Sequence, residues 1–172
     1  MCTYFHTTNK PLQVGETFSI DMFDGDATID HVNRCVEHKK TNDIFDKYRP
    51  NGVLSRKMCI YLFSNLSQCK IYANNKGYQY IYEVKCNDGV FGPYPMTLVT
   101  SLDKDPENMD IVNEYWNPTK NWKVFEFLTS SIVVLQVIPF EHERIYIDDY
   151  IIDREMSLRY YPYKEGGIYE KI

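Results

Sequence analysis

The stretch KMCIYLFSNLSQCKIYANNKGYQYIYEVK, residues 57–85, decides the fold. Residues 57–63 are mostly apolar and β-prone, which predicts a strand. Ser64 belongs to a residue type that caps helices, and the Asn-Asn-Lys-Gly run ending at Gly77 is typical of a helix terminus, so a short helix is expected between them. The alternating YQYIYEVK at 78–85 then predicts a second strand.

Before this stretch the pattern contains one strand and a helical region. Residues 2–6 are β-prone and are followed by the turn-like TTNKP, which predicts a strand ending in a loop. Across residues 28–47 apolar side chains recur at roughly helical spacing, with a polar interruption at 38–42. One or two helices are therefore expected in that region.

After this stretch most of the chain is β-prone. An Asn-Asp-Gly turn at 87–89 leads into an irregular FGPYP stretch, and the acidic segment at 103–110 is expected to start a short helix that ends at Asn117-Pro118. Further strands are expected at residues 122–128, 132–138, 144–152 and 156–161. Several strands with few helices, and late strands that are adjacent, favour an α+β fold with mainly antiparallel sheet.

Length and composition limit the classes of protein to which this chain can belong. A chain of 172 residues is expected to form one domain over 1–172, and 44% hydrophobic with 25% charged residues argues against disorder. A net charge of −5 gives no global basic excess for holding a polyanion, although it does not exclude a local basic groove. The cysteines are odd in number and form no C-x-x-C pair, which favours a reducing compartment over a disulfide framework or a zinc ribbon.

No membrane segment is expected. The longest uninterrupted aliphatic run, residues 132–135, is far shorter than the roughly 18 to 20 apolar residues that span a bilayer. The N-terminal MCTYFHTTNK lacks the basic start and apolar stretch of a signal peptide. The protein is therefore expected to be cytoplasmic, with no membrane partner.

Three short segments carry candidate functional residues. YFHTT, followed by the tight turn of LQVGE, places His6 at a strand end; Arg56 precedes the strand that contains Tyr61; and VFEFL sets Glu126 between aromatic residues. Each residue also has a purely structural interpretation. His6 can be a hydrogen-bonded structural histidine and Tyr61 a core residue, while a solvent-facing strand position accounts for Glu126. Arg56 can likewise be an exposed residue at the strand entry.

In this order the segments resemble the ADP-ribosyltransferase superfamily, in particular the compact rifamycin ADP-ribosyltransferases and their bacterial relatives. FHTT and LQVGE look like the Y-H-G-T strand and L-x-x-G-D turn that open those domains, with Thr7 in place of the glycine. IYLFS is similar to their I-Y-F-S strand, and GYQYIYEV resembles their G-x-I-Y-I-V-E strand. The late strands look like the N-E-Y-x-V strand and following hydrophobic strand of the H-Y-E branch, with Glu126 at the glutamate.

The resemblance implies split, mainly antiparallel β-sheets with a few short helices, around a groove that binds NAD. It implies catalytic roles for Glu126, Tyr61 and His6. NAD contacts are expected from His6, Thr7, Arg56 and Tyr61. Cleavage of the nicotinamide bond creates an oxocarbenium-like cation, which a fixed carboxylate such as Glu126 favours. Tyr61 would stack on the nicotinamide ring, His6 would bond the adenosine-side ribose, and Arg56 would contact the pyrophosphate.

The expected function is mono-ADP-ribosylation of a protein, RNA or DNA target by a toxin or defence effector that uses NAD as its substrate. An antitoxin or immunity protein is a further expected partner. Two alternatives stay open, namely a non-catalytic nucleotide- or nucleic-acid-binding module of the same fold and an NAD glycohydrolase. No metal site is expected, because His31, Cys35 and His38 lack an evident fourth ligand. Residues 139–172 have no family counterpart and are interpreted as a C-terminal extension of uncertain role, over the groove or against a partner.

Overall fold

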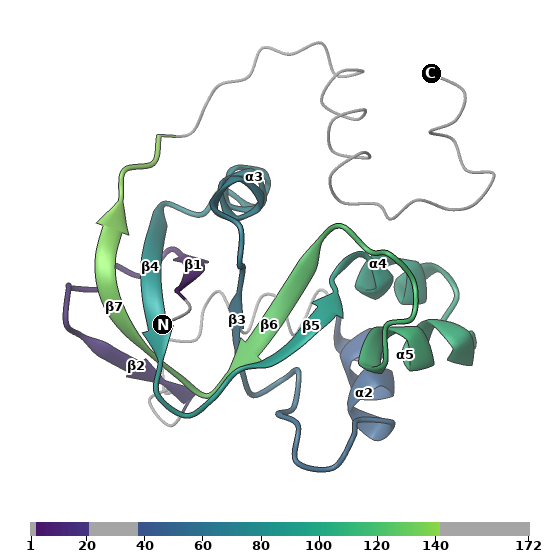
Figure 1. Ribbon diagram of the computed structural model, residues 1–172. Helices are drawn as coiled ribbons and strands as arrows, with labels where there is room; N and C mark the ends of the chain where they lie inside the picture. Colours follow the sequence, from purple (N-terminus) through teal and green to yellow (C-terminus); the bar gives the residue numbers. More distant parts are fainter. Residues whose placement is uncertain (1–2, 21–37, 142–172) are drawn as a thin grey trace, which may run out of the picture.

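Two antiparallel sheets and four helices make up residues 3–20 and 38–141, the part of the chain that the computed structural model describes (Figure 1). The α+β class expected from the sequence is confirmed. Outside the described residues lie the strands expected at 144–152 and 156–161 and the helical pattern before residue 38. His31, Cys35 and nearly all of the expected C-terminal extension lie there too.

The larger sheet has the strand order β1-β4-β7-β2. Its strands are β1 (Tyr4–Thr8), β4 (Tyr80–Cys86), β7 (Ser131–Ile138) and β2 (Thr17–Ser19). All three pairings are antiparallel, and β4 and β7 form the centre. β2 was not anticipated from the sequence. Its three residues pair with the start of β7 and bury Phe18 in the core.

The smaller sheet has the order β3-β6-β5. It consists of β3 (Ile60–Leu62), β6 (Phe125–Thr129) and β5 (Phe91–Pro95). The two sheets meet where β1 passes β3: the backbone N–H of Phe5 donates to the carbonyl of Phe63, and that of Phe63 donates to the carbonyl of Phe5, each at 2.8 Å. This single bridge places the candidate strand of His6 directly beside that of Tyr61.

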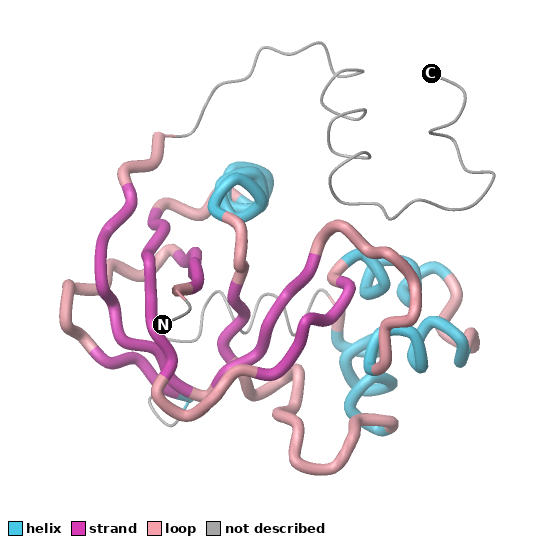
Figure 2. Tube along the Cα trace, in the orientation of Figure 1, coloured by secondary structure: helices cyan, strands magenta, loops and turns pink. Residues whose placement is uncertain are grey.

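Four helices flank the described sheets (Figure 2). They are α2 (Lys39–Lys47), α3 (Leu66–Lys76), α4 (Thr97–Lys104) and α5 (Met109–Trp116). α3 contacts β1 and β4, whereas α2, α4 and α5 pack against one another beside β5. The expected stop of α3 is confirmed, because Gly77 adopts the left-handed φ of 70° that glycine tolerates best.

Two local expectations were wrong. The cap of α3 is Asn65 rather than Ser64, and its side chain accepts from the Gln68 backbone N–H at 3.2 Å. The helix expected near residues 44–47 is present as α2, which begins at Lys39 inside the polar run at 38–42. The FGPYP stretch is a strand, β5, and not an irregular loop. α4, which follows β5, was also not expected.

Buried side chains form three clusters, and β3 belongs to more than one of them. Tyr61 enters the cluster under α2, α4 and α5, and Leu62 enters the cluster shared with β4 and β7. The next residue, Phe63, enters the cluster under α3. Because side chains alternate along a strand, Tyr61 faces away from its neighbours Ile60 and Leu62.

Candidate functional site

Glu126, the carboxylate singled out by its aromatic neighbours, lies inside the protein. It sits in β6, two residues before Leu128, which is paired with Tyr61 across the sheet. Since residues two apart share a face of a strand, Glu126 and Tyr61 face the same cluster. Only 1% of Glu126 is exposed, so the alternative interpretation of Glu126 as a solvent-facing strand residue is wrong. A charge buried to this degree requires a partner.

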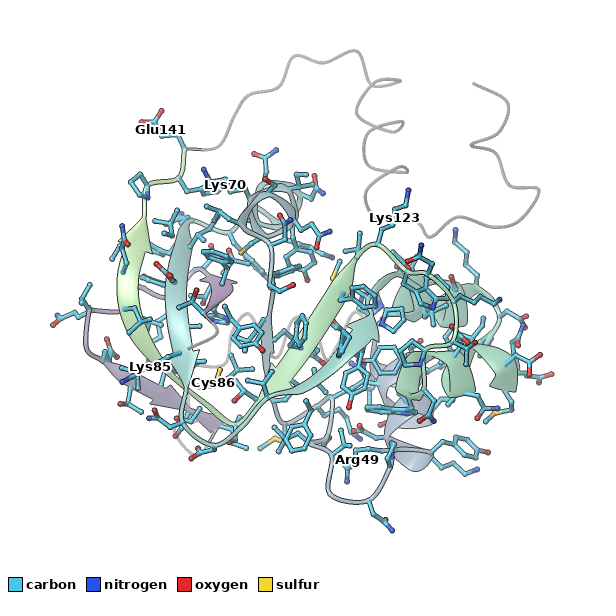
Figure 3. All side chains as sticks on the ribbon, in the orientation of Figure 1. Arg49, Lys70, Lys85, Cys86, Lys123 and Glu141 are labelled. Carbon is cyan, nitrogen blue, oxygen red and sulfur yellow. The ribbon has the colours of Figure 1, made fainter. Side chains whose placement is uncertain are left out.

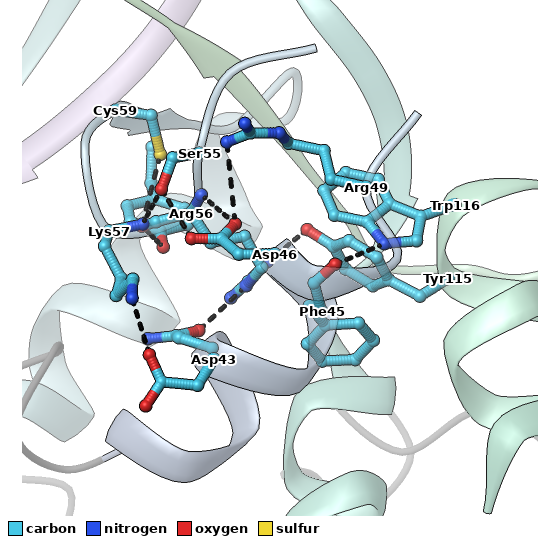
Figure 4. Close-up of polar contacts among 12 residues, drawn as sticks. Asp43, Phe45, Asp46, Arg49, Ser55, Arg56, Lys57, Cys59, Tyr115 and Trp116 are labelled. Atoms are coloured by element: carbon cyan, nitrogen blue, oxygen red, sulfur yellow. Dashed lines mark hydrogen bonds and ion pairs between the residues drawn. The ribbon is translucent and has the colours of Figure 1, made fainter. Parts of the chain in front are cut away.

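That partner is Arg56, which is itself only 2% exposed. Its Nη1 forms an ion pair with Glu126 Oε1 and also donates to the Tyr115 hydroxyl. Its Nε donates to Asn42 Oδ1 at 2.9 Å. Figure 4 shows Arg56 together with Tyr115 and the end of α2. By contrast, Lys123 projects outward, as basic side chains usually do (Figure 3).

Aromatic rings enclose the guanidinium. The Arg56 Cζ lies 4.8 Å from the ring centre of Tyr115, and 5.3 Å from those of Phe45 and Tyr61. Cation–π attraction of this kind is strongest where water is excluded. The site is therefore a charge pair in a shell of aromatic side chains drawn from α2, β3 and α5.

The buried environment sets the ionisation of these groups. Burial by itself would lower the pKa of the Arg56 guanidinium, but the charge of Glu126, the hydrogen bond to it, and the neighbouring Tyr115 and Tyr61 together hold that pKa well above its ordinary value. Burial also raises the pKa of the Tyr115 hydroxyl well above its ordinary value, despite the opposing effect of Arg56. Tyr115 is therefore a neutral hydroxyl that donates to Glu126 Oε1 at 2.8 Å.

The chain before β3 is fixed by side chains of α2 and of β3 itself. The backbone N–H of Arg56 donates to Asp46 Oδ1 at 2.8 Å, and the Ser55 hydroxyl donates to the other oxygen of the same carboxylate. The Tyr61 hydroxyl donates to the backbone carbonyl of Arg56. With both its backbone groups bonded, Arg56 is held in one position relative to the sheet.

His6 approaches this group from the neighbouring strand. It lies in the middle of β1 rather than at the strand end expected from the sequence, and its Nδ1 is 3.0 Å from the backbone carbonyl of Tyr61. A carbonyl only accepts, so Nδ1 carries the hydrogen. His6 is paired with Tyr82, whose ring belongs to the cluster of Leu62. His6 thus faces the opposite side of the β1–β3 junction from the Tyr61 ring.

Three of the expected site residues, Arg56, Tyr61 and Glu126, therefore lie together, and His6 contacts the backbone carbonyl of Tyr61. Thr7 is buried, and its hydroxyl donates to the Tyr80 carbonyl at 2.9 Å. As placed, Arg56 and Thr7 direct their polar groups to protein partners.

Sequence reasoning missed Tyr115, Asn42 and Asp46. Tyr115 lies in an apolar helix pattern and Asn42 in a polar run, so neither carries a local signal that separates it from its neighbours. The contacts that define them join residues far apart, such as Arg56 and Glu126 at a separation of 70.

No protein-family model matches this chain, and no curated protein matches it. Within residues 3–20 and 38–141, no helix is both long and apolar enough to cross a membrane. The same residues contain no cluster of three or more histidine, cysteine or acidic side chains arranged to hold a metal ion.

Proposed function

We propose that this protein is a mono-ADP-ribosyltransferase that cleaves NAD and transfers ADP-ribose to a macromolecule, as a toxin or defence effector acting in the cytoplasm. The proposal rests on the sequence resemblance together with one observation, the pairing of Glu126 with Arg56 beside the Tyr61 ring. A carboxylate held by a permanent cation is fixed in direction, which is what electrostatic stabilisation of a ribosyl cation requires.

In this mechanism the bond between nicotinamide and ribose breaks first, and its electron pair leaves with nicotinamide. The positive charge that develops on the ribose is stabilised by the Glu126 carboxylate, as in glycoside cleavage. A nitrogen or oxygen atom of the target then attacks the ribose carbon that carried nicotinamide, and its proton is released to solvent. Tyr61 supplies an aromatic face for the nicotinamide ring, and His6 and Thr7 lie on the strand proposed to hold the adenosine-side ribose.

Arg56 has a different role from the one expected from its sequence position. Its guanidinium is committed to Glu126, Tyr115 and Asn42, so we assign it to the carboxylate and not to the pyrophosphate. NAD reaches Glu126 only if side chains above it move, because the carboxylate is almost fully covered. The proposed reaction therefore includes an opening step before the chemistry.

The burial of Glu126 also favours a second function, a nucleotide-binding module without catalysis. In that case the pair of Arg56 and Glu126 only holds the smaller sheet to α2 and α5. An NAD glycohydrolase, with water as the acceptor, is the third possibility. The three differ in their products, so one experiment distinguishes them.

That experiment incubates the purified chain with NAD labelled in its ADP-ribose part, with and without cellular protein, RNA and DNA. Free nicotinamide together with labelled polymer supports the transferase. Nicotinamide without labelled polymer indicates the glycohydrolase, and neither product, with NAD still bound, indicates the binding module.

The matched variants are Glu126→Gln and Glu83→Gln. Both remove a carboxylate from a strand, but Glu83 lies in β4 on the other sheet. We expect Glu126→Gln to lower turnover by about 10²- to 10³-fold, the usual effect of losing a fixed electrostatic group, and Glu83→Gln to leave it unchanged. Equal turnover by Glu126→Gln and the parent would refute the assignment of Glu126.

A further inference from the structure

The hydroxyl of Tyr115 forms hydrogen bonds with both members of the buried ion pair. It accepts from Arg56 Nη1 and donates to Glu126 Oε1 at 2.8 Å, the oxygen that Arg56 also contacts. Two donors converging on one carboxylate oxygen restrict rotation of the carboxyl group. The direction of the second oxygen, Oε2, is consequently set by Arg56 and Tyr115 together.

The ring of Tyr115 is held independently of its hydroxyl. It is fully buried and packs on Phe45 at 4.3 Å, on Trp116 at 4.8 Å and on Tyr94 at 5.2 Å between ring centres. A phenylalanine would keep these ring contacts. The hydroxyl therefore adds a polar contact to the carboxylate that core packing alone does not need.

Resting on the proposed function, we propose that Tyr115 is a positioning residue that fixes the Glu126 carboxylate in the direction required for ADP-ribose transfer. It acts through Glu126 and does not touch NAD. A small misplacement of a reacting group is known to cost about 10²-fold in rate without a change of chemical mechanism. The Tyr115 hydroxyl also accepts from Arg56, and Arg56 in turn donates to Asn42 of α2. α2 therefore contributes to the same restraint on the Glu126 carboxylate.

The matched variants for the test are Tyr115→Phe and Tyr94→Phe. Tyr94 is a neighbouring buried tyrosine stacked on Tyr115, and none of the hydrogen bonds of the Arg56–Glu126 group involves its hydroxyl. Each variant removes one oxygen from the same aromatic cluster. NAD cleavage is measured by nicotinamide release at a temperature where thermal unfolding shows both variants fully folded.

We expect Tyr115→Phe to lower kcat about 10- to 100-fold with KM for NAD within about twofold of the parent. Tyr94→Phe should keep both constants near those of the parent. Arg56→Lys is a second variant, because lysine keeps the positive charge but cannot span Asn42, Tyr115 and Glu126 at once. It should show the same loss in kcat.

The possible results separate this inference from the function it rests on. A parent that does not cleave NAD overturns both. If the parent is active and Glu126→Gln is inactive, then full kcat in Tyr115→Phe, or an equal loss in Tyr94→Phe, overturns only the role of Tyr115. Failure of both Tyr115→Phe and Arg56→Lys to fold would make the contact structural, and would overturn the inference as well.

Discussion

The buried pair of Arg56 and Glu126 allows a quantitative prediction about stability. Arg56→Met keeps an unbranched apolar side chain at this position and removes the guanidinium. The variant leaves the Glu126 carboxylate with the charge of its partner removed, at a position that is 1% exposed. Removing one member of a buried ion pair costs about 3 to 5 kcal/mol, because the remaining charge stays desolvated.

This cost is large beside the total free energy of unfolding, which for a typical domain is about 5 to 15 kcal/mol. The loss of a hydrogen bond at Asn42 adds to this cost, because the Oδ1 of this buried residue no longer accepts from Arg56 Nε. With a urea m-value of about 2 kcal/mol/M, the midpoint of unfolding should fall by about 1.5 to 2.5 M. Urea unfolding followed by circular dichroism measures this shift.

The double variant Arg56→Met, Glu126→Gln tests the reason for the cost. An amide carries no charge, so the second substitution should restore part of the stability lost in Arg56→Met. The interaction free energy of the cycle should be about 1 to 3 kcal/mol. A loss below about 1 kcal/mol in Arg56→Met, or additive single effects, would refute the view that these two charges depend on each other.

Two further predictions concern stability elsewhere. Burial would raise the pKa of Glu114, but hydrogen bonds from Thr119, Trp122 and the backbone of residue 120 lower it from 4.5 to about 2. Because the pKa of Glu114 is lower in the folded than in the unfolded state, its carboxylate stabilises the fold at pH values above the unfolded pKa. Glu114→Ala should therefore lower the free energy of unfolding by about 1 to 2 kcal/mol at neutral pH, a value discounted because the side chain is partly exposed. Urea unfolding at pH 7, 4 and 2.5 should show this loss shrinking as the pH falls from 4.5 toward 2. In the same assay Gly92→Ala should lose about 1 to 3 kcal/mol more stability than Gly89→Ala. Both glycines have positive φ, but only a Cβ at residue 92 would meet Phe127 Cδ1, at 3.0 Å. Equal losses in the two variants would contradict this prediction.

Much of the fold could be predicted because its signals are local. The helix stop at Gly77 depends on one residue type in one conformation, and the alternation before Cys86 identifies β4 directly. The strand β5 was missed because its two prolines and one glycine argue against strand, although an edge position tolerates them. α4 was missed because it begins without a side-chain cap.

The candidate site was less predictable than the fold. Residue types and their order pointed to Arg56, Tyr61 and Glu126, and the structure places them together. The sequence could not indicate that Arg56 turns inward to Glu126, because that choice depends on α2 and α5 closing over both side chains. Tyr115 is found only once this packing is known.

Tyr61, Leu62 and Phe63 are consecutive, yet each side chain enters a different hydrophobic cluster. A one-residue slip of β3 would therefore misplace a side chain in all three clusters at once. This short strand fixes its own alignment despite having only three paired residues. Insertions and deletions between residues 60 and 63 would consequently be far more damaging than the same changes in the exposed loop that follows α5.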